Sequence, residues 1–263
     1  MKRSVLLRIV VLSVLAFSCS PAQKARVLHV NSLRGQLWPI EQDGAYRGGF
    51  SLLSSALKKA KNLSEGQPVY TVAVFNAIHG TPEAHFSEGQ AVVELMNASG
   101  FDALVVGPRE FYFGLNALET LAGKADFPFL AANVRLANGT PVPYLKPYFW
   151  DQRAKVGLIG LTPRQLIQQN LEQNVRGLEL VDEVQAVSEA LAELSRLGAK
   201  TIGLFAGGVV WGAPEGSQDA VTAERLLRLE GIDQYWFGSP SPDVPDGMTV
   251  LETELGPRVI VIQ

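Results

Sequence analysis

Histidine is scarce in this chain, and its few copies limit the acid–base and metal chemistry available. The chain contains three histidines, at His29, His79 and His85. His79 and His85 have Glu83 and Glu88 nearby in sequence, and imidazole and carboxylate groups together can bind a transition metal. Histidines in loops are more often only solvated, so we interpret this grouping as a weak signal and expect no rebuilt metal site.

The elements that must position such residues follow an alternating pattern. From residue 26 onward, short β-rich runs alternate with helical patterns, which predicts a layered α/β domain. The predicted strands are residues 26–31, 69–75, 103–106, 155–161, 201–205 and 233–237. Apolar spacing predicts a helix over residues 50–61. Two capping boxes, Ser87 with Gln90 and Asp182 with Gln185, predict two further helix starts. Ligands bind where the loops at strand ends converge, so chemistry is expected there.

Each predicted strand end carries a stretch of sequence that resembles one family. Residues 28–37 are similar to Leu-His-Thr-Asn-Asp-x-His-Gly-x-Leu, and residues 106–114 to a segment with Gly-Asn-His-Glu-Phe-Asp-x-Gly. Further matching stretches are residues 75–80, 96–103, 127–133, 155–162 and 231–238. In this order they resemble the 5′-nucleotidase and UDP-sugar hydrolase family. The resemblance implies an α/β fold, the calcineurin-like metallophosphoesterase four-layer α/β/β/α sandwich, over residues 26–263.

The family's chemistry uses two divalent cations, bridged by a carboxylate, that activate water and stabilise phosphoryl oxygens. Its first Asp and His match Ser32 and Arg34, its bridging Asp matches His79, its Asn-His pair matches Pro108 and Arg109, its next His matches Ala206 or Gly207, and its last two His match Ser239 and Ser241. Apart from a histidine at the bridging position, no acidic or imidazole ligand remains there. We therefore expect no metal, no cofactor and no two-metal catalysis. The resemblance also places His29 at a histidine that is not a usual ligand, which favours a core or supporting role.

The replacements have a direction, because two of them introduce arginine. Loss of the metals removes positive charge, and Arg34 with Arg109 would return two fixed charges to the vestigial site. One hypothesis is that they pair with a retained acid such as Glu110 and form a structural plug. The other is that they bind a phosphate-like anion through forked hydrogen bonds. The sequence is compatible with both hypotheses, the structural plug and the anion-binding site.

The first residues have the pattern of an export signal. Lys2, Arg3 and Arg8 precede a short apolar run, and the segment ends in Ala-Phe-Ser-Cys19-Ser, which resembles a bacterial lipobox. An ordinary signal peptide that happens to contain a cysteine is the alternative. Cys19 is the only cysteine and cannot form an internal disulfide, which favours the lipoprotein. We expect a signal segment over residues 1–19, a tether over 20–25, and one metallophosphoesterase-like domain over 26–263 without the nucleoside-gripping domain usual in the family.

Composition excludes one class of partner. The net charge is −3 and the isoelectric point is near 5.7, so the chain has no basic surplus for a nucleic-acid backbone. We expect a catalytically inactive, lipid-anchored protein of the bacterial envelope, facing the periplasm and favouring the outer membrane, that binds or scaffolds a protein partner. The alternatives are a phosphoester hydrolase with altered chemistry and a sensor of a phosphate-like anion or nucleotide.

Overall fold

The fold is given by a computed structural model, which describes residues 25–64, 66–210, 221–238, 247–253 and 256–262. For residues 247–262 we describe the backbone only. Cys19, Ser239 and Ser241 lie outside the described residues, so the structure does not test the predictions made for them. In the described part of the chain, no helix is long and apolar enough to cross a membrane.

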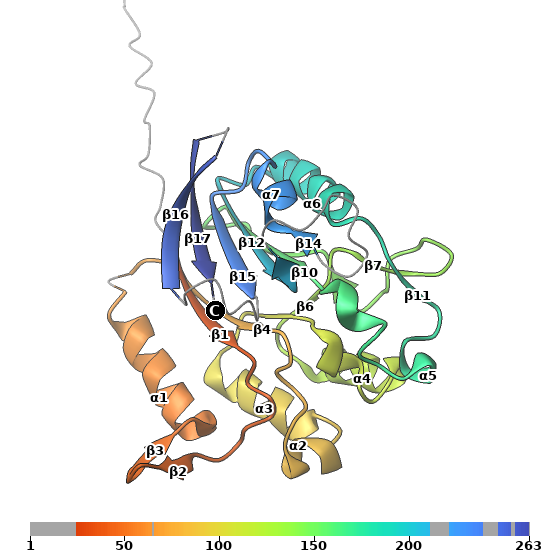
Figure 1. The fold of residues 1–263 in the computed structure, drawn as a ribbon. Helices are drawn as coiled ribbons and strands as arrows, with labels where there is room; N and C mark the ends of the chain where they lie inside the picture. The colour runs from red at the N-terminus through yellow and green to blue at the C-terminus, as the bar shows by residue number, and fades with distance from the viewer. Residues whose placement is uncertain (1–24, 65, 211–220, 239–246, 254–255, 263) are drawn as a thin grey trace, which may run out of the picture.

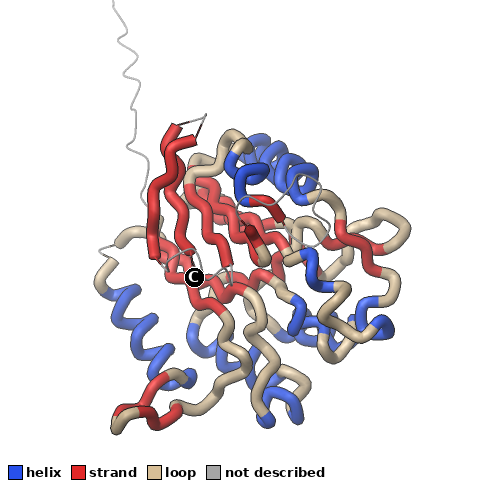
Figure 2. The backbone as a smooth tube through the Cα atoms, viewed as in Figure 1, coloured by secondary structure: helices blue, strands red, loops and turns tan. Residues whose placement is uncertain are grey.

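Two β-sheets pack face to face and helices cover their outer faces, as Figure 1 and Figure 2 show. The first sheet has the order β1-β4-β5-β6-β8 and its neighbours are parallel. Its strands are β1 (Arg26–Asn31), β4 (Val69–Val74), β5 (Ala103–Val105), β6 (Phe129–Leu130) and β8 (Leu145–Lys146).

The second sheet has the order β16-β17-β15-β12-β10-β9 and is parallel except at its two edge pairs. Its strands are β9 (Tyr148–Asp151), β10 (Val156–Leu161), β12 (Thr201–Gly207), β15 (Gln234–Gly238), β16 (Gly247–Thr253) and β17 (Gly256–Ile262). Three small pairs lie outside these sheets: β2 (Ile40–Gln42) with β3 (Ala45–Arg47), β7 (Val134–Leu136) with β11 (Leu178–Leu180), and β13 (Val209–Val210) with β14 (Val221–Thr222).

The helices divide between the two outer faces. The first sheet carries α1 (Gly49–Asn62), α3 (Gln90–Ser99) and α4 (Leu115–Lys124), and the second carries α6 (Glu183–Leu197) and α7 (Ala223–Leu227). Short turns of helix follow several strands: α2 (Pro82–Phe86), η1 (Pro108–Phe111), η2 (Arg164–Leu166) and α5 (Glu172–Val175).

Three apolar cores lie between the layers. One core joins the first sheet to its helices, and includes Phe50, Met96 and Leu118. A second joins the other sheet to α6 and α7. The third lies between the sheets, where the Phe205 and Trp236 rings stack with centroids 4.5 Å apart. Helix, sheet, sheet and helix therefore form four layers, and the predicted fold class is confirmed.

The helix predictions were right in outline and wrong in one boundary. The helix predicted over residues 50–61 is α1, and Asp182 caps α6 by accepting from the N–H groups of Val184 and Gln185. Ser87 does not open α3, because Gly89 is its N-cap and Ser87 instead ends α2. The chain turns at Gly89 in the left-handed conformation (φ 84°), which a glycine adopts without strain.

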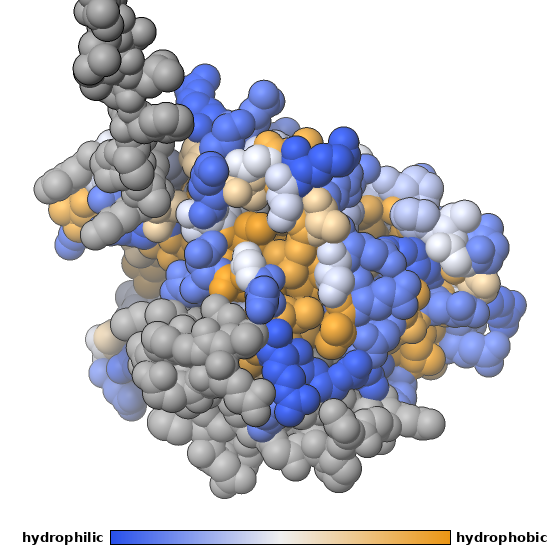
Figure 3. All heavy atoms as spheres, turned by 90° about the horizontal axis from the view of Figure 1, so that it is seen from above, coloured by the Kyte–Doolittle hydropathy of each residue, from blue (hydrophilic) through white to orange (hydrophobic). Residues whose placement is uncertain are grey.

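The carboxyl ends of both sheets meet at one edge of the sandwich. A Cβ atom added at Gly207, at the end of β12, would lie 2.7 Å from the Phe75 ring after β4 and 2.7 Å from Pro163 after β10. At the opposite edge, seen from above in Figure 3, hydrophobic atoms gather in the middle and hydrophilic atoms surround them. Loops from both sheets therefore converge at the edge formed by the carboxyl ends.

Candidate functional site

The loops after β1 and β4 form the floor of the site and are joined through their backbones. The N–H groups of Ser32, Arg34 and Gly35 donate to carbonyls of residues 74, 76 and 77 over 2.7–3.0 Å. Ser32, Arg34, Phe75 and Asn76 all have positive φ, between 48° and 54°, although none is glycine. Such backbone strain costs free energy and is typical of functional sites. These loops therefore have the geometry of a functional site.

Glu110 is the buried anion of this region. It is 1% exposed and accepts four backbone N–H groups: Asn76 at 2.9 Å, Ala77 at 2.5 Å, Ile78 at 3.2 Å and Gly107 at 2.7 Å. Burial raises the pKa of Glu110, while the four N–H donors oppose that shift because they favour the carboxylate. The residue thus holds the β4 loop against the start of η1.

The backbones of Arg34 and Arg109 are both hydrogen-bonded to Asn76. The Arg34 N–H donates to the Asn76 carbonyl at 2.8 Å, and the Arg109 N–H donates to Asn76 Oδ1 at 3.2 Å. Both arginines are exposed. Asn76 therefore fixes the backbone of both arginines at the mouth of the site.

The structural plug predicted with Glu110 does not form. Both Glu110 oxygens are occupied by backbone N–H groups, and neither arginine has an ion pair with any residue that the structure describes. The prediction was wrong because the carboxylate turns inward to satisfy amides that would otherwise be buried without an acceptor. The guanidinium groups are left facing outward.

His79 lies in a group of aromatic rings beside Arg109. It stacks on Tyr112 with ring centroids 3.8 Å apart and an interplanar angle of 17°, and His85 and Phe113 lie 5.8 Å and 5.3 Å from it. Burial, and then the charges of Arg109 and His85, lower the pKa of His79. Its buried Nδ1 has no hydrogen-bond partner among the described residues. The imidazole is therefore held neutral against a tyrosine face.

None of the other matched positions that the structure describes carries a carboxylate or an imidazole. Pro108 and Ala206 are buried, and Gly207 has no room for a side chain between Phe75 and Pro163. Ser32 is half-buried, and its hydroxyl donates to Asn31 Oδ1 at 3.3 Å. In this part of the edge, an aromatic ring occupies the place where a ligand side chain would have to enter.

A two-metal centre does not fit these residues. Two dications need several carboxylate and imidazole ligands that converge. Within the described ranges, no three His, Cys, Asp or Glu side chains are grouped so that they could hold a metal ion. His79 and His85 approach each other, but Glu83 and Glu88 do not complete a site with them.

His29 lies away from the mouth of the site. It is in β1, next to Phe205 of the other sheet, with ring centroids 6.2 Å apart. Burial lowers its pKa to about 4. A neutral, packed imidazole agrees with the supporting role predicted from the sequence.

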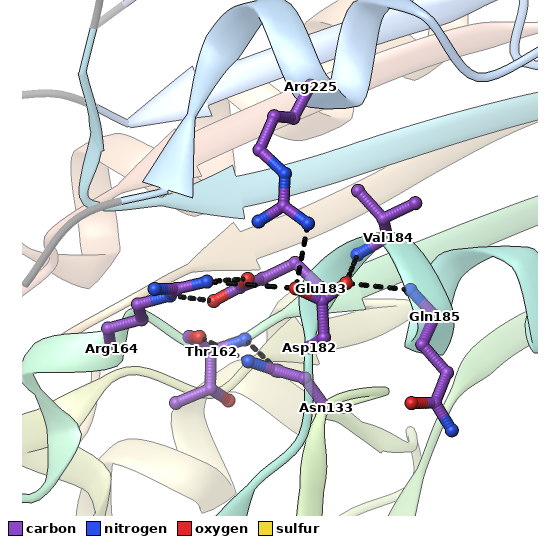
Figure 4. A network of polar contacts seen from close by, with 8 residues as sticks. All are labelled: Asn133, Thr162, Arg164, Asp182, Glu183, Val184, Gln185 and Arg225. Atoms are coloured by element: carbon purple, nitrogen blue, oxygen red, sulfur yellow. Dashed lines mark hydrogen bonds and ion pairs between the residues drawn. The ribbon is translucent and has the colours of Figure 1, made fainter. Parts of the chain in front are cut away.

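A polar network supports the same edge next to the second sheet, as Figure 4 shows. Glu183 is 1% exposed and pairs with Arg164 through two contacts of 2.5 Å. Asp182 accepts from Arg225 at 2.8 Å while it caps α6. Asn133 and Thr162 exchange two hydrogen bonds of 2.9 Å between the two sheets. These contacts fix the loops after β6, β10 and β11.

Sequence reasoning missed Phe75, Asn76 and Tyr112. Asn76 lies in a stretch that had been matched to the family, but its role depends on two loops that are distant in sequence. Phe75 is indicated only indirectly, by the small residue at Gly207, whose neighbouring space a ring can fill. No signal in the sequence indicates that Tyr112 stacks on His79.

Comparison with known proteins identifies relatives of one kind in sequence and in structure. No family model matches the chain. UshA of Salmonella pullorum is 30% identical over 172 residues, which are 62% of this chain and 30% of that protein. The 5′-nucleotidase of Vibrio cholerae is 26% identical over 206 residues, 74% of this chain and 36% of that protein. The chain thus spans about a third of the length of these curated relatives.

Solved structures show the same fold. A 5′-nucleotidase precursor from Thermus thermophilus superposes with a TM-score of 0.72 at 19% identity, over 90% of this chain and 48% of that one. The calcineurin-like phosphoesterase YfkN from Bacillus subtilis gives 0.69 at 20% identity, over 89% and 80%. The fold is that of the calcineurin-like phosphoesterases. The neighbours of this chain in sequence and structure are 5′-nucleotidase and UshA-type metallophosphoesterases, and the resemblance seen in the sequence is confirmed.

Proposed function

We propose that this chain is a non-catalytic binding or scaffold protein built on a metallophosphoesterase domain. The observation that carries the proposal is the set of side chains at the strand ends, where a two-metal centre would require converging carboxylates and imidazoles. Ser32, Arg34, Pro108, Arg109 and Gly207 offer none of these groups. Guanidinium groups cannot ligate a cation, and a proline offers no side-chain donor atom.

The packing around the strand ends supports the same proposal. The Phe75 ring and Pro163 fill the space beside Gly207, so a metal-binding side chain introduced at this position would clash with them. Both carboxyl oxygens of Glu110 accept hydrogen bonds from backbone amides, so this side chain is not available to bridge cations. Hydrogen bonds within the chain thus hold the loops of this edge.

A phosphatase screen tests the proposal. The full chain, purified in mild detergent, is supplied with Mn²⁺, Co²⁺, Zn²⁺ or Mg²⁺ and offered phosphate monoesters, cyclic nucleotides and nucleotide sugars. We expect no turnover above that of a sample boiled beforehand. Hydrolysis that disappears when EDTA is added would contradict the proposal.

We also propose that the protein is anchored in the bacterial envelope through acyl chains on Cys19 and faces the periplasm, with the outer membrane favoured because Ser20 is not an acidic retention signal. A stable anchor of this kind needs more than one acyl chain. Cys19→Ala should move the protein from the membrane fraction to the soluble fraction. Equal membrane association of variant and wild type would reject the anchor.

One observation favours a second candidate function, a hydrolase with altered chemistry. A neutral imidazole beside a guanidinium could act as a base without metal, and His79 has a lowered pKa next to Arg109. This candidate predicts EDTA-resistant hydrolysis of phosphate esters that is lost in His79→Ala. If the screen described above finds no such turnover, the candidate fails.

A further inference from the structure

Exposed apolar side chains concentrate at the edge formed by the carboxyl ends of the strands. Among the described residues, ten large hydrophobic side chains are exposed, and seven of them lie between the carboxyl end of a strand of a main sheet and the next long helix. These seven are Trp38, Ile40 and Tyr46 after β1, Phe86 after β4, Tyr112 after β5, and Ile167 and Leu171 after β10. Apolar side chains grouped on one surface indicate an interaction site.

Three of these side chains are aromatic and largely exposed. Phe86 is 85% exposed, Trp38 is 69% exposed and Tyr46 is 67% exposed. Trp38 lies two residues before the β2–β3 hairpin, Tyr46 lies in β3 and Phe86 in α2, and Figure 1 shows the hairpin and α2 along the lower side of the molecule. Aromatic side chains bring large contact areas to an interface at low entropic cost, and they are enriched at the residues that dominate binding.

At this edge, two arginines lie between elements that carry acidic side chains. Arg34 and Arg109 are tied to the same Asn76 and have no ion-pair partner among the described residues. Acidic side chains stand on the flanking elements: Glu41 and Asp43 in and next to the hairpin strands, and Glu83 and Glu88 around α2. A partner that complements this pattern presents acids to the centre and apolar groups beside them.

Both arginines start from ordered backbone. Their main chains are fixed by the hydrogen bonds to Asn76, and Arg109 lies one residue before Glu110, which four N–H groups hold. Tyr112, three residues after Arg109, is stacked on His79. Preorganised groups lose less conformational entropy on binding, and the affinity is correspondingly higher.

We propose that this edge binds an acidic segment of a protein partner, with carboxylates on Arg34 and Arg109 and apolar side chains on Tyr112 and Phe86. This inference rests on the proposed non-catalytic binding function and names the chemistry of its partner. Guanidinium groups form forked hydrogen bonds with carboxylates, which gives specificity as well as affinity. A free anion would use the two charges but would leave the seven exposed apolar side chains uncovered.

The test is a selection from a phage-displayed library of random peptides against the full chain in mild detergent. We expect the enriched peptides to combine Asp or Glu with Phe, Leu or Trp. Binding of an enriched peptide should fall at least about tenfold in Arg34→Gln and in Arg109→Gln, because each loses a charge-assisted hydrogen bond. It should not change in Arg153→Gln, which removes the same charge from an exposed residue in the turn before β10, at the opposite edge.

Three outcomes would overturn the inference. They are enrichment of neutral or basic peptides, equal binding by the wild type and both edge variants, and failure of any peptide to be enriched while millimolar inorganic phosphate shifts the NMR signals of the arginine loops. The last outcome would indicate a small-anion sensor. None of them depends on the phosphatase screen, so failure of this inference can be told apart from failure of the proposed function.

Discussion

Glu110 shows how the loops at the candidate site are held together by groups of the chain itself. Four backbone N–H groups from two loops point at its carboxylate, and they would be buried without an acceptor if it were absent. The sequence indicated that the acid is retained but suggested the wrong partner, an arginine. Sequence cannot reveal which way a side chain turns when both a guanidinium and a set of amides are within reach.

Glu110→Gln should destabilise the domain strongly. The amide has one acceptor oxygen, and its NH₂ group would face backbone donors, so we expect a loss of about 3 kcal/mol in the free energy of unfolding. Urea denaturation measures this. Glu119→Gln, at an exposed position on α4, is the matched control and should change little. Equal stability of the two variants would mean that the amide cradle does not depend on charge.

His29 makes a part of the stability depend on pH. Its pKa is about 4 in the folded protein, compared with 6.5 for an unperturbed histidine. As the pH falls, the unfolded chain therefore binds the proton first, and stability falls between about pH 6.5 and pH 4. Between pH 7 and pH 4.5, the free energy of unfolding is expected to fall by about 2 to 3 kcal/mol because of this pKa difference.

His29→Leu should lose less stability on acidification than the wild type does, by about that amount. Urea denaturation at pH 7 and at pH 4.5 gives the two differences. His79 contributes acid sensitivity of the same sign and is present in both proteins, so it cancels in the comparison. Parallel losses in the two proteins would show that His29 is solvated in the folded state.

Among the elements, α6 shows what local sequence can and cannot predict. Its start at Asp182 follows from the capping box and was predicted, and it ends at Gly198, which has the left-handed conformation common at helix ends. The ion pairs of Asp182 with Arg225 and of Glu183 with Arg164 join segments far apart in the chain, and no local pattern indicates them. For α3 the local signal was misleading, because Ser87 was needed to end the preceding helix.

Two substitutions separate the cap of α6 from its ion pairs. Asp182→Ala removes both and should cost about 1 to 2 kcal/mol of folding free energy. Asp182→Asn keeps a side-chain oxygen for the cap and should retain most of that stability. Chemical denaturation of both variants, with Arg225→Gln as a third, tests this. If Asn is as damaging as Ala, the ion pairs and not the cap dominate.

For the whole molecule, the order of family-like stretches was enough to predict the layered fold and the edge at which the site lies. It also located Arg34, Arg109 and His79 around one mouth, as the structure shows. What fills the space between them was not predictable. Phe75 meets Gly207 and Tyr112 stacks on His79 only because the two sheets and their loops pack together.

The central proposal is that this edge does not bind a pair of metal ions. The most direct measurement is the Mn²⁺ stoichiometry of the full chain by titration calorimetry and elemental analysis after dialysis. The control is a variant in which the matched ligands are restored by Ser32→Asp, Arg34→His, His79→Asp, Pro108→Asn and Arg109→His. We predict no stoichiometric Mn²⁺ in the wild type and measurable Mn²⁺ binding in the restored variant. Two equivalents of tightly bound Mn²⁺ in the wild type would contradict the account.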